Sequence, residues 1–286
     1  MAEAEAHPAP FAIGHTRFEW GTRTFVMGIV NATPDSFSGD GVLDPALAAE
    51  QARRMVEEGA DLLDVGAEST RPDFPAIDAD EEWARLEPVL RAVRSAVDVP
   101  VSVDTSKAAV AERAFEAGAD ALNDVKGLLG DAELASVLAR SGLPAILMHN
   151  QRDRAFGGDV IADIRFSLEE SIVIAERAGV DRERLIVDPG FGFGWTPGQN
   201  LEMVRRLGEL RPLGRPILLG TSRKSTIGLV LDRPVDGRLG GTLATTALAV
   251  QSGVDIVRVH DVAENVEVAR MADAIVRGWA PPQPSA

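Results

Sequence analysis

The segment GADLLD, residues 59–64, shows the unit from which this chain is built. The same layout recurs in GADALN at 118–123 and in GVDIVR at 253–258. In each segment we expect the glycine to end a helix in the left-handed conformation, after which the chain turns into a short apolar strand. The polar residue five positions after the glycine then falls at the C-terminal end of the strand. The three segments therefore predict helices that alternate with parallel strands.

Eight short apolar runs along the chain each stop at a polar or charged residue, and an amphipathic stretch follows each of them. The runs, with the polar residues that follow, are Phe25–Val30 (Asn31), Leu62–Leu63 (Asp64), Val101–Val103 (Asp104), Ala121–Leu122 (Asn123), Ala145–Met148 (His149), Leu185–Val187 (Asp188), Ile217–Leu219 (Ser222 to Lys224) and Ile256–Val257 (Arg258 and His260). Eight strand–helix units predict an α/β fold, the (β/α)8 TIM barrel, whose active site lies at the C-terminal rim of the strands. Polar residues at that rim indicate an enzyme.

Length and composition fit a single cytoplasmic domain. The 286 residues suit one barrel, which typically needs about 250. Without cysteine the chain forms no disulfides or thiolate metal sites, which fits a reducing cytoplasm. The first residues lack the features of a signal peptide, and no apolar stretch approaches the roughly 20 residues that span a bilayer. A net charge of −15 argues against nucleic acid or an anionic membrane as the main partner.

The two ends of the chain are expected to lie outside the barrel. Residues 1–10 and 279–286 are predicted to be disordered, and residues 11–278 to form one domain. Within it, Phe11–His15 and Phe18–Thr24 are predicted to form a β-hairpin that plugs the N-terminal end of the barrel. Asp44 and Pro45 supply the N-cap and first turn of a helix that ends near Gly59.

Four cationic residues fall at predicted strand ends of this otherwise acidic chain: Arg71, Lys224, Arg258 and His260. A cluster of this kind focuses a positive potential on one site and binds anions. The alternative is that each is an ordinary surface charge, which explains one such position better than four. We therefore expect an anionic ligand at the rim.

The motifs at the predicted strand ends resemble those of the dihydropteroate synthase family of pterin-binding enzymes. They are MGIVNATPDSFS (27–38), DVGAESTRP (64–72), VDTSK (103–107), ND (123–124), LMH (147–149), DPGFGFG (188–194), SRKS (222–225) and RVHD (258–261). Singly these motifs are weak, but in this order and spacing they cover about residues 18–277. The resemblance implies a folate-pathway transferase that joins 6-hydroxymethyl-7,8-dihydropterin pyrophosphate to p-aminobenzoate and is a sulfonamide target.

A pterin presents an amine and a ring N–H side by side, and the two oxygens of one carboxylate match this edge. Asp188 fits that task, and the resemblance assigns it the same role. The alternative is that Asp188 only caps a turn after its strand, but three nearby glycines favour close approach of the backbone to a ligand. The remaining pterin-binding residues expected are Asp104, Asn123, Met148, Phe191 and Lys224.

The diphosphate requires positive charge, which eases its departure. Arg258 and His260 are two residues apart on a strand and therefore point to the same side. The resemblance adds Arg71 to the diphosphate site and implies Mg²⁺ with Asn31 as its protein ligand, which suits an ion that keeps much of its hydration. The alternatives are that Asn31 caps a turn and that His260 is a buried, neutral histidine.

Two long predicted loops, 31–44 and 66–80, are expected to act as lids over the rim. The resemblance implies that they complete the p-aminobenzoate site, although Phe37 is open to interpretation as a simple loop anchor. The residues assigned to that site are Phe37, Thr70, Arg71, Pro72, Phe193 and Ser225, with Ser225 receiving the carboxylate.

We expect a dissociative substitution, in which Asp104 and Asp188 hold a cationic methylene-pterin while Lys224 and Arg258 complete the catalytic set. Two alternatives are a methyltetrahydrofolate–corrinoid methyltransferase and a homologue that binds pterin without turnover. The resemblance also implies a homodimer formed through residues 238–277. Several positions depart from the family pattern, among them Asn150 and Gln151.

Overall fold

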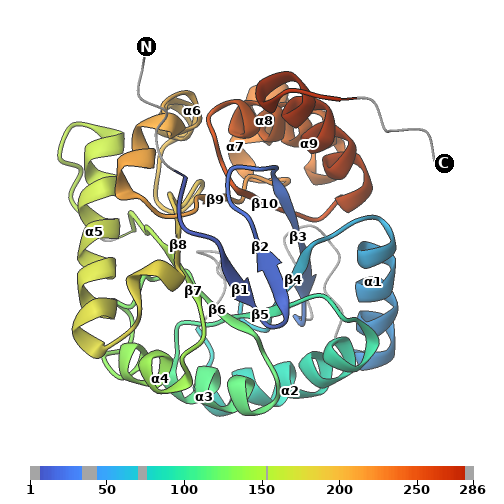
Figure 1. Cartoon of the computed structure of the whole chain (residues 1–286), viewed down its shortest axis with the longest axis vertical. Helices are drawn as coiled ribbons and strands as arrows, with labels where there is room; N and C mark the ends of the chain where they lie inside the picture. The colour runs from blue at the N-terminus through green and yellow to red at the C-terminus, as the bar shows by residue number, and fades with distance from the viewer. Residues whose placement is uncertain (1–6, 34–43, 70–75, 153, 281–286) are drawn as a thin grey trace.

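Eight parallel strands form a closed barrel surrounded by helices (Figure 1). The computed structural model describes residues 7–280 except 34–43, 70–75 and 153. The strands are β3 (Phe25–Asn31), β4 (Leu62–Gly66), β5 (Val101–Asp104), β6 (Ala121–Asp124), β7 (Ala145–Met148), β8 (Leu185–Asp188), β9 (Leu218–Leu219) and β10 (Ile256–Val259). They are ordered β8-β7-β6-β5-β4-β3-β10-β9, and a bridge between Val187 and Ile217 joins the two ends of that order. The predicted TIM barrel is confirmed.

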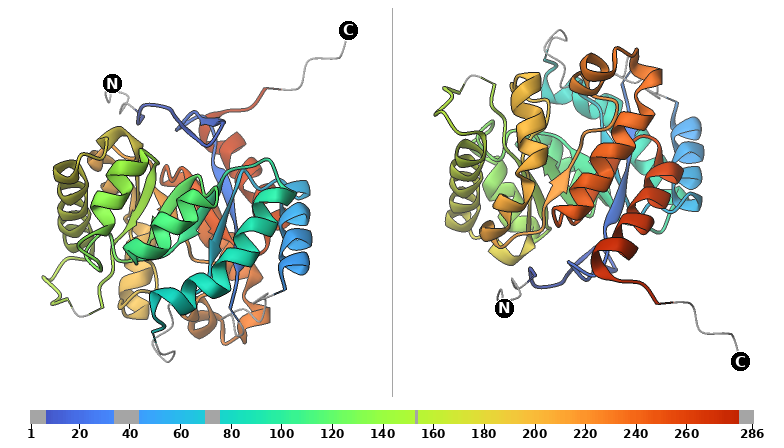
Figure 2. Two further views of the ribbon diagram at one scale, coloured as in Figure 1. Left: turned by 90° about the horizontal axis from the view of Figure 1, so that it is seen from below. Right: turned by 90° about the horizontal axis from the view of Figure 1, so that it is seen from above.

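The helices lie outside the strands, as the two side views in Figure 2 show. They are α1 (Pro45–Glu57), α2 (Ala79–Ala96), α3 (Ala108–Glu116), α4 (Leu134–Ser141), α5 (Val160–Ala178), α6 (Pro197–Arg205), α7 (Ser225–Leu231), α8 (Leu239–Gln251) and α9 (Val262–Arg277), with 3-10 turns at Arg182–Arg184, Leu207–Leu213 and Val235–Gly237. Asp44 caps α1 as predicted, because its carboxylate accepts from the backbone N–H groups of Ala46 and Leu47. In the described parts of the chain, no helix combines the length and hydropathy that crossing a bilayer would require.

The glycines of the repeated segment adopt the conformation that the sequence predicts. Gly59, Gly118 and Gly253 have φ values of +104°, +98° and +80°. Each lies two residues beyond the last residue of a helix and starts the turn into the next strand, so the repeat is a structural unit of the barrel.

A β-hairpin closes the N-terminal end of the barrel. Its strands are β1 (Phe11–Ile13) and β2 (Thr16–Phe18), so the second strand begins and ends earlier than predicted. Its apolar side chains join Trp20 and inward-facing residues of every barrel strand except β5 in one buried cluster. This aromatic plug leaves the opposite, C-terminal end of the barrel for the polar side chains.

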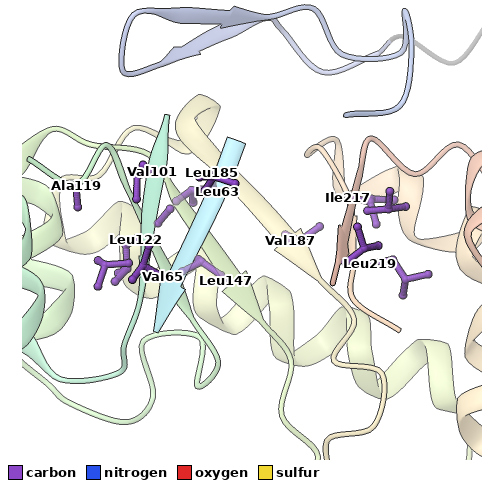
Figure 3. Close-up of a cluster of buried hydrophobic side chains, with 14 of the residues drawn as sticks. Leu63, Val65, Val101, Ala119, Leu122, Leu147, Leu185, Val187, Ile217 and Leu219 are labelled. Carbon is purple, nitrogen blue, oxygen red and sulfur yellow. The ribbon is translucent and has the colours of Figure 1, made fainter. Parts of the chain in front are cut away.

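One strand is longer than the sequence suggested, and this changes the role of a carboxylate. The apolar run Leu62–Leu63 was expected to stop at Asp64, but β4 continues to Gly66. Leu63 and Val65 belong to the buried layer between strands and helices (Figure 3). Because side chains alternate along a strand, Asp64 points into the barrel, below the rim.

Candidate active site

The C-terminal ends of the strands enclose a cavity of about 330 Å³. Ten of the residues predicted for the site line it: Asn31, Asp104, Asn123, Met148, Asp188, Phe193, Lys224, Ser225, Arg258 and His260. Strands β3, β5, β6, β7, β8 and β10 each supply at least one of these side chains, and the segments after β8, β9 and β10 supply the others. Residues far apart in the sequence are therefore brought to a single site.

The remaining predicted residues do not line the described cavity. Phe37, Thr70, Arg71 and Pro72 lie outside the described residues. Phe191 was expected to pack on a pterin ring, but its side chain is 1% exposed and belongs to the buried core between strands and helices. Only its backbone carbonyl reaches the site, where it accepts a hydrogen bond of 2.5 Å from Lys224 Nζ.

Asp64 lies at the centre of a buried network beneath the cavity, a role that the sequence analysis missed. Its Oδ2 accepts from Arg258 Nε at 2.6 Å and from Asn123 Nδ2 at 2.8 Å. Arg258 Nη2 also donates to Asp104 Oδ2 at 3.0 Å. One guanidinium thus serves two carboxylates, and the network fixes the orientation of three side chains that line the cavity. The alternation of Leu62, Asp64 and Gly66 was the signal that could have revealed it.

Burial and the second carboxylate make Asp104 hard to ionise in the free protein. Burial is the main cause that raises the pKa of Asp104, to about 8, and the charge of Asp64 adds to it, while Arg258 opposes the rise. For Arg258, burial works against the charged form, but the charges of Asp64 and Asp104 outweigh it and raise its pKa. A positive charge that develops in the cavity would favour the ionised form of Asp104.

Asp188 and Lys224 form a second pair of opposite charges. Burial raises the pKa of Asp188, while Lys224 and a 2.8 Å hydrogen bond from the Gly190 N–H oppose the rise. Burial likewise lowers the pKa of Lys224 to about 8, with the charge of Asp188 acting against it. Both groups therefore titrate closer to neutrality than usual, which is common at sites that bind and transform ligands.

The glycines after β8 make room mainly for a neighbouring loop. A Cβ at Gly190, where φ is +75°, would lie 1.8 Å from the carbonyl oxygen of His149. A Cβ at Gly194, where φ is +84°, would lie 2.5 Å from the backbone nitrogen of Arg152. The expectation that all three glycines approach a ligand is wrong for these two, and only Gly192 lines the cavity.

His149 and His260 have different environments. His149 is buried outside the cavity against Trp195, with ring centroids 5.3 Å apart, and burial lowers its pKa to about 4. His260 lines the cavity, and its Nδ1 lies 2.9 Å from Ser222 Oγ. Arg258 lies in β10, which pairs with β3, and His260 directly follows β10. This side of the cavity can hold an anion.

Comparison with known proteins decides the family. Residues 27–260 match the family model described as pterin binding enzyme. The dihydropteroate synthase of Clostridium beijerinckii is 48% identical over 267 residues, which cover 93% of this chain and 99% of the relative. The chain belongs to the dihydropteroate synthase family. The dihydropteroate synthase of Bacillus subtilis is 44% identical over 273 residues, which cover 94% of this chain and 93% of the relative.

Solved dihydropteroate synthase structures share the fold of the chain. The Clostridium difficile enzyme in the presence of pteroic acid has a TM-score of 0.86 and 48% identity, with 91% of this chain and 99% of that chain covered. The Xanthomonas albilineans enzyme with 4-aminobenzoic acid has a TM-score of 0.87 and 39% identity, with 94% of this chain and 98% of that chain covered. As a dihydropteroate synthase, the chain is a transferase of the pterin group.

Proposed function

We propose that the chain makes 7,8-dihydropteroate and pyrophosphate from 6-hydroxymethyl-7,8-dihydropterin pyrophosphate and p-aminobenzoate by a dissociative substitution. The observation that carries this proposal is that one cavity combines Asp188, Asn123 and Lys224 with the cationic residues Arg258 and His260. The first group suits a flat heterocycle with several donors and acceptors, and the second suits a departing diphosphate.

In the proposed complex, the Asp188 carboxylate accepts from the pterin amine and the adjacent ring N–H. Lys224 donates to the pterin carbonyl or ring nitrogen, and Asn123 offers an amide that is already oriented by its hydrogen bond to Asp64. Met148, which lines the cavity, provides an apolar contact for a ring face. Orientation of these groups before binding lowers the cost of fixing the substrate.

The C–O bond at the pterin methylene breaks first, and pyrophosphate leaves with the electron pair. The methylene-pterin then carries a positive charge, which Asp104 and Asp188 stabilise from within a buried site. The neutral amine of p-aminobenzoate attacks the methylene carbon and then loses a proton, which gives a secondary amine. Arg258 and His260 face the negative charge that develops on the leaving group, and we propose that Arg71 acts there as well.

We propose that Mg²⁺ assists this departure. The donors present fit such an ion: Asn31 brings an amide oxygen to the cavity, and the described residues contain no group of three or more acidic or histidine side chains that could hold a metal alone. Asn31 would then be the protein ligand, with water and substrate phosphate oxygens completing the coordination. When bound, the ion would neutralise charge on the diphosphate.

We place p-aminobenzoate beside Phe193 and Ser225, which both line the cavity. The ring of Phe193 provides an aromatic contact, and Ser225 can donate to the carboxylate. The 4-aminobenzoic acid present with the Xanthomonas albilineans relative supports an arylamine of this kind. Phe37, Thr70, Arg71 and Pro72 remain proposed members of this site.

We also propose that two copies of the chain associate through α8 and α9, which lie side by side (Figure 1). These helices expose large apolar side chains, namely Leu248, Met271, Ile275 and Val276. Exposed apolar groups on adjacent helices are typical of surfaces that bind another protein, and the small residues of α8 permit close packing.

The test of the proposed reaction is to incubate the protein with both substrates and Mg²⁺ and to measure dihydropteroate and pyrophosphate. We expect both products in equal amounts, and expect Lys224→Ala to lower kcat/KM about 100-fold, because one charge-assisted contact in such a site contributes about 2–4 kcal/mol. Lys126, which is exposed and does not line the cavity, provides the control Lys126→Ala. Absence of product, or methyl transfer from methyltetrahydrofolate instead, would contradict the proposal.

A further inference from the structure

Arg152 lines the cavity, although neither the motifs nor the family resemblance assigned it a role. It lies in the segment after β7, directly after Asn150 and Gln151. Its guanidinium carbon lies 4.9 Å from the centroid of the Phe193 ring, and Lys224 Nζ lies 4.6 Å from the same centroid. One aromatic ring of the proposed arylamine site therefore contacts two cations.

The backbone fixes the position of Arg152 relative to that ring. Its own N–H donates to Asn150 Oδ1 at 3.1 Å, and Asn150 Nδ2 donates to the carbonyl of Val125 at 3.1 Å. The Gln151 N–H donates to the carbonyl of Phe193 at 3.0 Å. The segment is therefore held between the residues that follow β6 and those that follow β8, and Arg152 keeps its place beside Phe193.

The two cations also act on each other. The positive charge of Arg152 is one of the causes, after burial and Arg258, that lower the pKa of Lys224. Their fields therefore add within this part of the cavity. Ser225, the residue proposed to receive the carboxylate of p-aminobenzoate, follows Lys224 directly and lines the same cavity. A negatively charged group there would be attracted by both cations.

We propose that Arg152 is a specificity-determining residue, which supplies a second positive charge for the carboxylate of the arylamine and so favours anionic over neutral arylamines. This inference rests on the proposed function for the identity of the ligand class. It also explains why Arg152 lies on the ring of Phe193: a cation held by an aromatic face can act at the carboxylate end of a substrate that packs on the same aromatic residue.

The test compares a charged arylamine with an uncharged ester of the same aromatic amine. Binding of 4-aminobenzoate and of its neutral ethyl ester is measured by calorimetry on the full chain, with oxidised hydroxymethylpterin, pyrophosphate and Mg²⁺ present. We expect Arg152→Gln to weaken 4-aminobenzoate about five- to tenfold and to leave the ester within about twofold, because only the carboxylate senses the lost charge. Arg152→Lys should retain most of the affinity, and high salt should reduce the difference.

The matched control is Arg154→Gln, which removes the same charge two residues away. Arg154 pairs with Glu170 at 3.3 Å and does not line the cavity, so we expect unchanged binding of both ligands. The proposal is overturned if Arg152→Gln weakens both ligands equally, which would indicate support of the Phe193 ring alone. It is also overturned if neither ligand weakens, or if the unsubstituted protein does not bind 4-aminobenzoate.

The two proposals can fail separately. Charge-dependent binding without formation of dihydropteroate would remove the proposed reaction and leave the role of Arg152 intact. Normal formation of dihydropteroate, with Arg152→Gln indistinguishable from the unsubstituted protein in ligand binding, would remove the role of Arg152 and leave the proposed reaction intact.

Discussion

Replacement of Asp104 by asparagine should make the stability of the protein less dependent on pH and should lower its activity. Burial and the charge of Asp64 raise the pKa of Asp104 from 3.8 to about 8. Between these two values the folded protein binds a proton that the unfolded chain has lost. The free energy of unfolding therefore falls as pH rises through this range, and it stops falling above about 8.

The magnitude follows from the width of that range. A difference of one proton changes the free energy of unfolding by about 1.4 kcal/mol per pH unit. From pH 6 to pH 8 the free energy of unfolding falls by about 2 kcal/mol. The fall is slightly smaller than that for one proton over two full pH units, because the folded carboxyl begins to ionise near pH 8. The amide that replaces this carboxyl cannot titrate. The stability of Asp104→Asn relative to the unsubstituted protein should therefore rise by about 2 kcal/mol over this interval.

Urea unfolding followed by tryptophan fluorescence at both pH values measures this difference. Other titrating groups largely cancel, because they are present in both proteins. Asp98→Asn is the control, since Asp98 is exposed just before β5 and should give the same difference at both pH values. We expect Asp104→Asn to lower the activity in steady-state turnover about 100-fold, because about 2–4 kcal/mol of transition-state stabilisation is lost. A constant stability difference, or activity within about threefold of the unsubstituted protein, would refute the reasoning.

Two further predictions concern the network below the cavity and the outer helices. Asp64→Asn should lower the free energy of unfolding, measured by urea unfolding, by about 3–5 kcal/mol, because it leaves the buried guanidinium of Arg258 with one carboxylate. A decrease of less than about 1 kcal/mol would show that the network is not needed for stability. Met271→Asp together with Ile275→Asp should convert a dimer into a monomer by light scattering, whereas Leu47→Asp, at an exposed position of α1, should not. An unchanged mass for the double variant, or a monomeric unsubstituted protein, would rule out association through α9.

The sequence predicted the strand–helix alternation and the polar rim because these depend on local properties. Glycine is the residue that ends helices in the left-handed conformation, and Gly59, Gly118 and Gly253 do so. Apolar runs of strand length and stripes of helical period then give the order of the elements. Since the C-terminal ends of parallel strands meet at one rim, Asp104, Asn123 and Asp188 could be expected at one site before any coordinates were known.

The direction in which particular side chains point depended on the tertiary structure. Strand β4 passes the residue where its apolar run ends, so the interior face of the barrel gained Asp64. Around Phe191 and Phe193, glycines with positive φ interrupt the regular alternation of side chains, so one ring entered the core and the other reached the cavity. Arg152 met Phe193 only because the loops after β7 and β8 are neighbours in the closed barrel.

The amino-acid sequence thus determined which elements form and which chemical groups reach the rim, since helix ends, apolar periodicity and strand polarity are encoded within a few residues. Only the tertiary structure decided which groups share a guanidinium or an aromatic face. Those relations depend on which face of its strand a residue occupies and on contacts between segments far apart in the chain, and a local sequence pattern does not determine them.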